Sequence, residues 1–71
     1  MHDKYLVEID YTNHQGMRTM RRILPHEFRF EASEWHPEQQ WVLVAFDTEK
    51  NQFRHFAMKD IHSWRPLVFE T

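Results

Sequence analysis

Hydrophobic and polar residues alternate along the first part of the chain, as they do in a half-buried strand. In YLVEIDYT, residues 5–12, apolar side chains occupy every second position and acidic ones lie between them: Tyr5, Val7, Ile9 and Tyr11 against Glu8 and Asp10. The next four residues, NHQG, predict a tight turn in which Gly16, the only glycine, takes a positive φ. The segment MRTMRRILPHEFRF, residues 17–30, follows as a second strand. Because Pro25 has no N–H to donate, we expect an edge, a bulge or a break there.

The second half of the chain begins with an almost continuous apolar run, WVLVAFD at residues 41–47. A run of this length predicts a strand that is buried on both faces. The residues TEKN then predict a hairpin turn in which Asn51 adopts the left-handed conformation. The remaining segments are interpreted as a loop at 31–40, a return strand at 52–58, a single turn at 59–64 and a last strand at 65–71.

Five short strands without a sustained helical period predict an all-β fold with at most a short helical turn. We expect one domain over residues 1–71, forming a small five-stranded antiparallel barrel, because closure removes exposed sheet edges. Two packed antiparallel hairpins without closure are the alternative. A chain of this size buries only about 60% of its unfolded surface and here has no cysteine to cross-link it. Its large aromatic fraction, 15%, is therefore expected to supply the core, with these members: Trp41, Leu43, Ala45, Phe53, Phe56 and Ile61.

The charges of the chain are unevenly distributed around a net charge of −2. Four arginines and one acid lie between residues 17 and 30, whereas residues 31–49 carry five acids and no Lys or Arg. A negative chain is not expected to bind nucleic acid strongly and without regard to sequence, because such binding depends on neutralising phosphates. The uneven charge predicts either a dipolar surface or a solvated face with local salt bridges.

Signatures of catalysis and of metal binding are missing from the sequence. The six histidines show no HxH, HxxxH or HExxH spacing, and no cysteine accompanies them. There is no P-loop, GxGxxG or GxSxG motif either. We therefore expect a protein that is not an enzyme and that holds no metal or cofactor.

The hydropathy of the chain and its first residues indicate its cellular location. No window approaches the roughly 18 apolar residues of a membrane span. The first ten residues, MHDKYLVEID, are charged early and lack the long apolar region of a signal peptide. We expect a soluble, cytoplasmic protein that does not associate with membranes.

Two segments taken together resemble the WYL domain family. WVLVAFDTEKNQFRHFAMKDI, residues 41–61, is similar to the family's central hairpin with its Arg-x-Phe motif, and IDYTNHQG with RRILPHEF is similar to its opening hairpin. The resemblance implies a barrel related to the Sm and SH3 barrels. It also implies a regulatory role in which the domain senses a ligand, in several members a nucleotide or single-stranded nucleic acid, often for a fused helix-turn-helix. No helix-turn-helix pattern occurs in these residues, so a DNA-directed output would need a partner chain.

The chain departs from the family pattern at Val42, where the family has its central Tyr, and at Asp60, where it usually has Arg. In the family both groups face the ligand cleft. Arg54 corresponds to the arginine of the Arg-x-Phe motif, and its planar guanidinium suits a phosphate or a carboxylate. The alternative is an exposed Arg54 that pairs across the hairpin with Asp47 or Glu49.

The other candidate ligand contacts are Arg18, Arg22 and Trp35. Strand alternation places Arg18 and Arg22 on one face and Arg21 on the other, and the pair points outward if Ile23 points inward. Arg21 remains a further possible anion contact. Trp35 is either a cap on the barrel or a stacking surface for a base. A second hypothesis for the whole chain is an interaction module that binds another protein or itself through its apolar edges.

Overall fold

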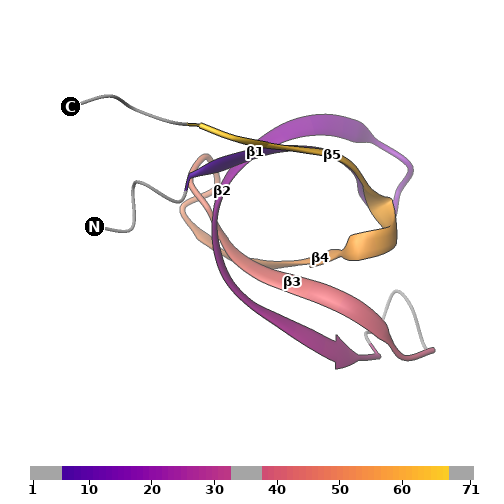
Figure 1. Ribbon diagram of the computed structural model, residues 1–71. Coiled ribbons are helices and arrows are strands. Elements are labelled where there is room, and N and C mark those ends of the chain that lie inside the picture. The colour runs from indigo at the N-terminus through magenta and orange to yellow at the C-terminus, as the bar shows by residue number, and fades with distance from the viewer. Residues whose placement is uncertain (1–5, 33–37, 68–71) are drawn as a thin grey trace.

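The computed structural model describes residues 6–32 and 38–67, which form a single antiparallel sheet with almost no helix (Figure 1). Its strands are β1 (Val7–Thr12), β2 (Arg18–Glu31), β3 (Gln40–Asp47), β4 (Gln52–Ala57) and β5 (Ile61–Pro66), with one 3₁₀ turn, η2 (Met58–Asp60), between β4 and β5. The hydrogen-bonded order is β4-β3-β2-β1-β5. The prediction of a mostly-β fold with five antiparallel strands is confirmed.

The sheet is curled but not closed. Figure 1 shows β1 and β5 on the opposite side of the ring from β4. The strands at the two edges of the sheet are β4 and β5, and they do not pair with each other in the described part of the chain. The closed barrel that the sequence predicted is therefore not formed. Two separate hairpins are not formed either, because β2 pairs with β1 along its first half and with β3 along its second half.

The bend in β2 lies at its proline. The register between β2 and β3 shifts between Pro25 and Glu27, which is the irregularity expected where a residue cannot donate a ladder hydrogen bond. Up to Ile23 the strand follows β1, and beyond Pro25 it continues only beside β3. The bulge therefore allows one strand of 14 residues to serve both halves of the sheet.

Both predicted turns have the predicted backbone. Gly16 has a φ of 82°, and the Asn13 side chain accepts hydrogen bonds from the backbone N–H groups of Gln15 and Met17 at 2.9 and 3.0 Å. Asn51 has a φ of 59°, and its N–H donates to the carbonyl oxygen of Asp47 at 2.7 Å. A left-handed residue closes each hairpin, as the sequence indicates.

The core lies on the inner face of the curled sheet. Each of the first four strands contributes side chains at alternate positions: Val7, Ile9, Tyr11, Ile23, Leu43, Ala45 and Phe56. The rings of Tyr11 and Phe56 meet edge to face with their centroids 4.9 Å apart. Met58 and Ile61 pack against this cluster from the 3₁₀ turn and the start of β5.

Two aromatic residues expected in the core are exposed instead. Trp41 is 56% exposed because it lies at the open end of β3, where only Phe30 of β2 faces it. Phe53 is 60% exposed because it is three residues from Phe56, an odd separation that places the two rings on opposite faces of a strand. The prediction that β3 is buried on both faces is nevertheless confirmed, since residues 42–45 are all buried.

The last strand begins earlier than the sequence predicted. β5 starts at Ile61, directly after the 3₁₀ turn, because residues 61–66 pair with β1. The expected strand at 65–71 therefore overlaps it only at its start, and residues 68–71 lie outside the described part of the chain. Trp35 and the middle of the predicted loop lie outside it as well. No helix in the described residues is long and apolar enough to cross a membrane.

Candidate ligand cleft

A cleft of about 590 Å³ lies where β4 faces the end of β1 and the turn that follows it. Side chains from β1, β2, β3 and β4 and from the turn after β1 line it, among them Tyr11, Asn13, Arg21, Gln52, Arg54 and Phe56. Its volume falls in the range of small-molecule sites. The curl of the sheet thus creates a polar opening beside the apolar core.

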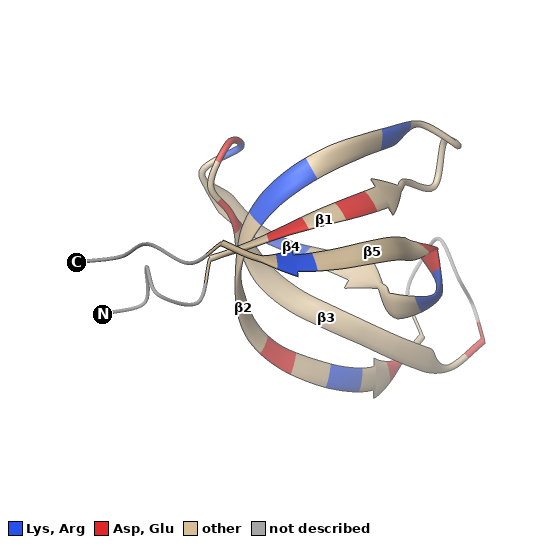
Figure 2. Ribbon diagram, turned by 45° about the horizontal axis from the view of Figure 1, so that its top comes forward, with Lys and Arg blue, Asp and Glu red and all other residues tan. Residues whose placement is uncertain are grey.

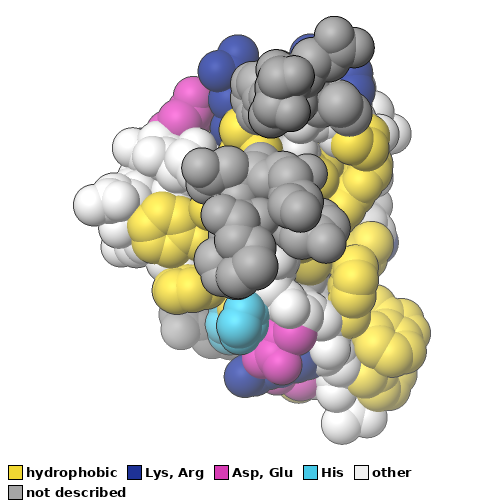
Figure 3. Space-filling model, turned by 60° about the vertical axis from the view of Figure 1, so that its left-hand side comes forward, with side chains coloured by type: hydrophobic (Ala, Val, Ile, Leu, Met, Phe, Trp, Pro, Cys, Tyr) yellow, Lys and Arg dark blue, Asp and Glu magenta, His cyan; other side chains and the backbone are white. Residues whose placement is uncertain are grey.

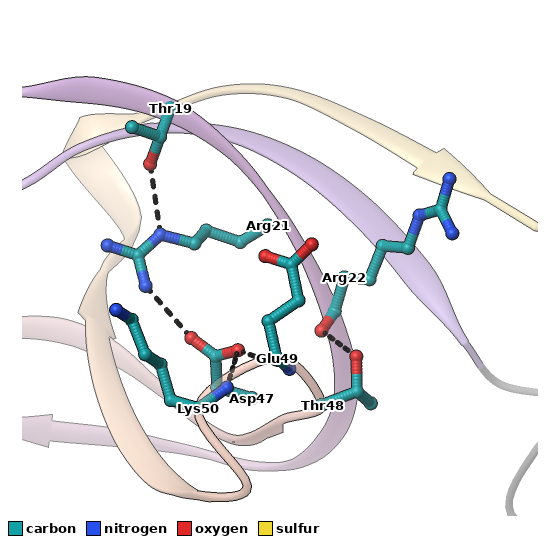
Figure 4. Close-up of polar contacts among 7 residues, drawn as sticks. All are labelled: Thr19, Arg21, Arg22, Asp47, Thr48, Glu49 and Lys50. Atoms are coloured by element: carbon teal, nitrogen blue, oxygen red, sulfur yellow. Dashed lines mark hydrogen bonds and ion pairs between the residues drawn. The ribbon is translucent and has the colours of Figure 1, made fainter.

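Arg21 is fixed in this cleft by a buried carboxylate (Figure 4). Its Nη1 donates to Oδ2 of Asp47 at 2.9 Å, and its Nε donates to the hydroxyl of Thr19 at 2.9 Å. The Asp47 side chain is fully buried and that of Arg21 is 12% exposed. The guanidinium group is therefore held by two strands at once, and its charge is balanced within the protein.

The same carboxylate organises the β3–β4 turn. Oδ1 of Asp47 accepts hydrogen bonds from the backbone N–H groups of Glu49 and Lys50 at 3.0 and 3.1 Å. Thr48 ties the turn to β2, because its hydroxyl and its N–H both donate to the Arg22 carbonyl oxygen, as Figure 4 shows for the hydroxyl. Asp47 thus connects the turn geometry to the position of Arg21.

Tyr11 contributes a hydroxyl group next to both cleft arginines. Burial raises the pKa of Tyr11, and the negative charge of Asp60 adds to this rise. The backbone N–H of Ala57 and the guanidinium groups of Arg21 and Arg54 act in the opposite direction on the same pKa. The phenol is therefore protonated at neutral pH and can donate a hydrogen bond beside the two cations.

Arg54 lies on the inner face of β4, two residues before the buried Phe56. Among residues 6–32 and 38–67, no carboxylate is within ion-pair distance of its guanidinium. The pairing across the hairpin that was the alternative for Arg54 is not formed: Asp47 pairs with Arg21, and Glu49 forms no ion pair with Arg54. Arg54 is thus a cleft cation that forms no ion pair within residues 6–32 and 38–67, and Glu31 lines the same cleft.

Arg18 and Arg22 lie elsewhere, on the outer face of the sheet. Arg18 donates to both carboxylate oxygens of Asp10 at 2.8 Å, and Arg22 lies 3.6 Å from Glu8. Their side chains are 61% and 59% exposed, which confirms that they point away from Arg21. Figure 2 shows these basic positions of β2 beside the acidic positions of β1.

These outer ion pairs alter the titration of both acids. A hydrogen bond from Arg65 lowers the pKa of Glu8, and one from Arg18 lowers the pKa of Asp10. Each arginine of this outer group thus has a carboxylate partner, and Arg22 and Arg65 share Glu8. The structure therefore brings Arg54 to the cleft but not Arg18 or Arg22, while Trp35 lies outside the described residues.

Two cleft residues were not among the chief candidates from the sequence, Tyr11 and Arg21. The sequence did contain a signal for them, because both share strand parity with residues assigned to the core: Tyr11 with Ile9, and Arg21 with Ile23. Arg54 shares parity with Phe56 in the same way. Following the inward face of each strand would have grouped Arg54 with Arg21 instead of with Arg18 and Arg22.

No group of three histidine or acidic side chains in the described residues is placed to hold a metal ion. The polar groups that line the cleft are two guanidinium groups, a phenol, the amides of Asn13 and Gln52, the imidazoles of His14 and His55 and the carboxylate of Glu31. The guanidinium groups can bind an anion through charge-assisted hydrogen bonds.

The fold and cleft together define a small, open β-sheet module with a cationic cleft at its gap. The family model of the WYL domain matches residues 1–66, and the chain belongs to that family. No curated protein sequence matches the chain significantly.

Among solved structures, the chain is similar to proteasome accessory factor B/C (PafBC) of Arthrobacter aurescens, with a TM-score of 0.72 and 22% sequence identity. The match covers 97% of this chain but 11% of that one. At this identity the likeness shows a shared fold, and the chain corresponds to a small part of a much longer protein.

Proposed function

We propose that the chain is a non-enzymatic regulatory module that senses a small anionic ligand in the cleft between β1 and β4. One observation carries the proposal: Arg54 has no carboxylate partner among the described residues and lies in the same cleft as Tyr11 and Arg21. Ligand sensing, the usual role of the family, supports it. The curl of the sheet also supports a relationship to the Sm and SH3 barrels, with the gap beside β4 as the ligand entrance.

The number of available cations limits the ligand. Arg54 offers a full charge, whereas Arg21 shares its charge with Asp47 and offers mainly its remaining N–H donors. Two contacts suit the phosphate of a nucleotide or one or two phosphates of a short single strand. Binding should therefore be modest, with a salt dependence of roughly 1.4 log units of affinity per log unit of salt for a single strand.

The experiment is a titration of the wild-type chain at low salt with adenosine monophosphate, inorganic phosphate and a short thymidine oligonucleotide. The Arg54→Ala variant should bind the preferred probe about tenfold more weakly or worse, because it loses a charge-assisted hydrogen bond. Arg18→Ala is the matched control and should bind like wild type, since Arg18 is paired with Asp10 on the outer face. Equal binding by wild type and Arg54→Ala, or no binding below millimolar probe, would contradict the proposal.

The second hypothesis from the sequence, an interaction module, finds support in the unpaired edge of β4. A cytoplasmic location stays a prediction from the sequence.

A further inference from the structure

We propose that the free edge of β4 accepts an extended peptide strand from a partner protein, one in which an acidic residue is flanked by apolar residues. This interaction goes beyond anion sensing. It rests on three features of β4: an edge that pairs with no other described strand, the charge of Arg54, which forms no ion pair among the described residues, and an aromatic surface on its outer side.

Within residues 6–32 and 38–67, no strand pairs with the outer edge of β4. β4 is the first strand in the order of the sheet, with β3 as its only neighbour among the described strands. The backbone N–H of Ala57 is directed at the Tyr11 hydroxyl, which lies across the gap from β4. Because hydrogen-bonding directions alternate along an antiparallel strand, the N–H and C=O groups of Phe53 and His55 point the same way, toward the free edge. An added strand could form up to four backbone hydrogen bonds with these two residues.

The side chains of β4 specify the chemistry of that strand. A residue opposite Arg54 would lie on the inner face, where the guanidinium lacks a carboxylate partner among the described residues. An aspartate or glutamate at that place would supply one. Its two neighbours in the peptide would point to the outer face, beside Phe53 and His55.

Aromatic side chains lie on this outer face of β4. Phe53 is 60% exposed, and its ring meets those of Phe46 and His26 at centroid distances of 5.3 and 5.6 Å. Figure 3 shows hydrophobic side chains at the surface in a group at the left of that view and in a longer column at its right. At β4 alone such a group adjoins both an unpaired backbone and a cleft arginine, among the described residues. An apolar residue of the peptide would cover Phe53.

A second copy of this chain is the weaker occupant. If two β4 strands paired around His55, each Arg54 would face Phe56 of the copy, and the two Arg54 side chains would be diagonal neighbours on one face. The two His55 rings would face each other. No acidic residue occurs in Gln52–Ala57 to balance these cations. The charges of β4 thus favour an acidic strand over self-pairing.

The test uses a capped synthetic peptide in which valine and glutamate alternate, followed by NMR of the whole chain. Binding should slow hydrogen exchange of the Phe53 and His55 amides at least tenfold, because both become hydrogen-bonded. A peptide with N-methyl groups on its valines cannot donate to β4 and should give no such protection. A peptide with lysine in place of glutamate should bind at least tenfold more weakly.

Two variants separate strand addition from other binding. Arg54→Glu should reverse the preference, so that the lysine peptide binds better than the glutamate peptide. Phe53→Ala should weaken the glutamate peptide and leave the fold intact, because the Phe53 ring is mostly exposed. Both variants are checked for a native amide spectrum.

Equal binding of the N-methylated peptide, or unchanged exchange at Phe53 and His55, would overturn the proposal. Protection of these amides by raised protein concentration alone would overturn it in favour of self-pairing. The N-methyl comparison tests only the backbone hydrogen bonds of the peptide, so a negative result would not contradict anion binding in the cleft. A negative anion titration would likewise not contradict strand addition to β4.

Discussion

The two faces of the curled sheet use arginine in different ways. On the outer face the exposed side chains of Arg18, Arg22 and Arg65 each pair with a carboxylate of β1, Arg18 with Asp10 and the other two with Glu8. On the inner face Arg21 is held by a buried carboxylate, and Arg54 has no carboxylate partner among the described residues. The difference shows that the number of arginines in a segment says little about anion binding. What matters is which face they occupy and whether the sheet has already balanced them.

The energetics of the two faces should differ as well. Exposed ion pairs contribute little to stability, because water and salt screen them. Removing one partner of a buried ion pair lowers the free energy of unfolding strongly, because the other charge is left buried without a partner. Stability measurements on matched inner and outer residues therefore test the comparison.

The largest effect is expected for the inner aromatic ring. Phe56→Ala should lower the free energy of unfolding by about 3–5 kcal/mol, because the ring is fully buried against Tyr11 and leaves a cavity. Phe53→Ala on the outer face of the same strand should cost less than about 1 kcal/mol. Urea unfolding of both variants checks this. Similar losses would show that the two faces of β4 are wrongly assigned.

The next effect is expected for the buried carboxylate. Asp47→Ala removes the partner of Arg21 and the acceptor of two turn amides, and should cost about 3 kcal/mol. Its outer counterpart, Asp10→Ala, should change the urea midpoint only marginally, since Asp10 and Arg18 form their pair in solvent. If Asp10→Ala destabilised the protein as much as Asp47→Ala, the outer pairs would have to be considered structural.

The smallest effect is a pH dependence from the outer face. The pKa values of Glu8 and Asp10 lie below their ordinary values of 4.5 and 3.8, because Arg65 and Arg18 donate to them. A lowered pKa stabilises the folded state above the unfolded pKa, and this contribution is lost as the pH falls through the folded value. The small stability advantage of wild type over Asp10→Asn should thus be constant at neutral pH and shrink below about pH 4. Unfolding midpoints across that range measure it, and a gap that widens on acidification would be inconsistent with these pairs.

Local patterns predicted much of this fold. Alternation located β1, a continuous apolar run located β3, and the two predicted turns located β2 and β4 beside them. The residues with special backbone preferences marked both turns and the bulge at Pro25. These features depend on residues that are close in sequence, so they can be predicted from it. The exposure of Trp41 could not be predicted in this way, because it depends on how far β1 and β4 extend beside β2 and β3.

The candidate site was predicted less well, for a related reason. Arg54 could be selected from its motif, and the opposite directions of Arg18 and Arg21 followed from alternation. That β4 curls round to face Tyr11 depends on the order and curvature of the whole sheet. The start of β5 at Ile61 was missed because pairing with β1, and not local preference, sets it.

The most direct test of the contrast between the faces is NMR of the arginine Nε–H groups during a titration with inorganic pyrophosphate. Assignment by single Arg→Lys variants would give each guanidinium its own signal. The signals of Arg54 and Arg21 should shift in a saturable way, while those of Arg18 and Arg22 stay in place because both guanidinium groups already pair with carboxylates of β1. Larger saturable shifts at Arg18 and Arg22, with Arg54 unchanged, would contradict the assignment of the cleft as the anion site.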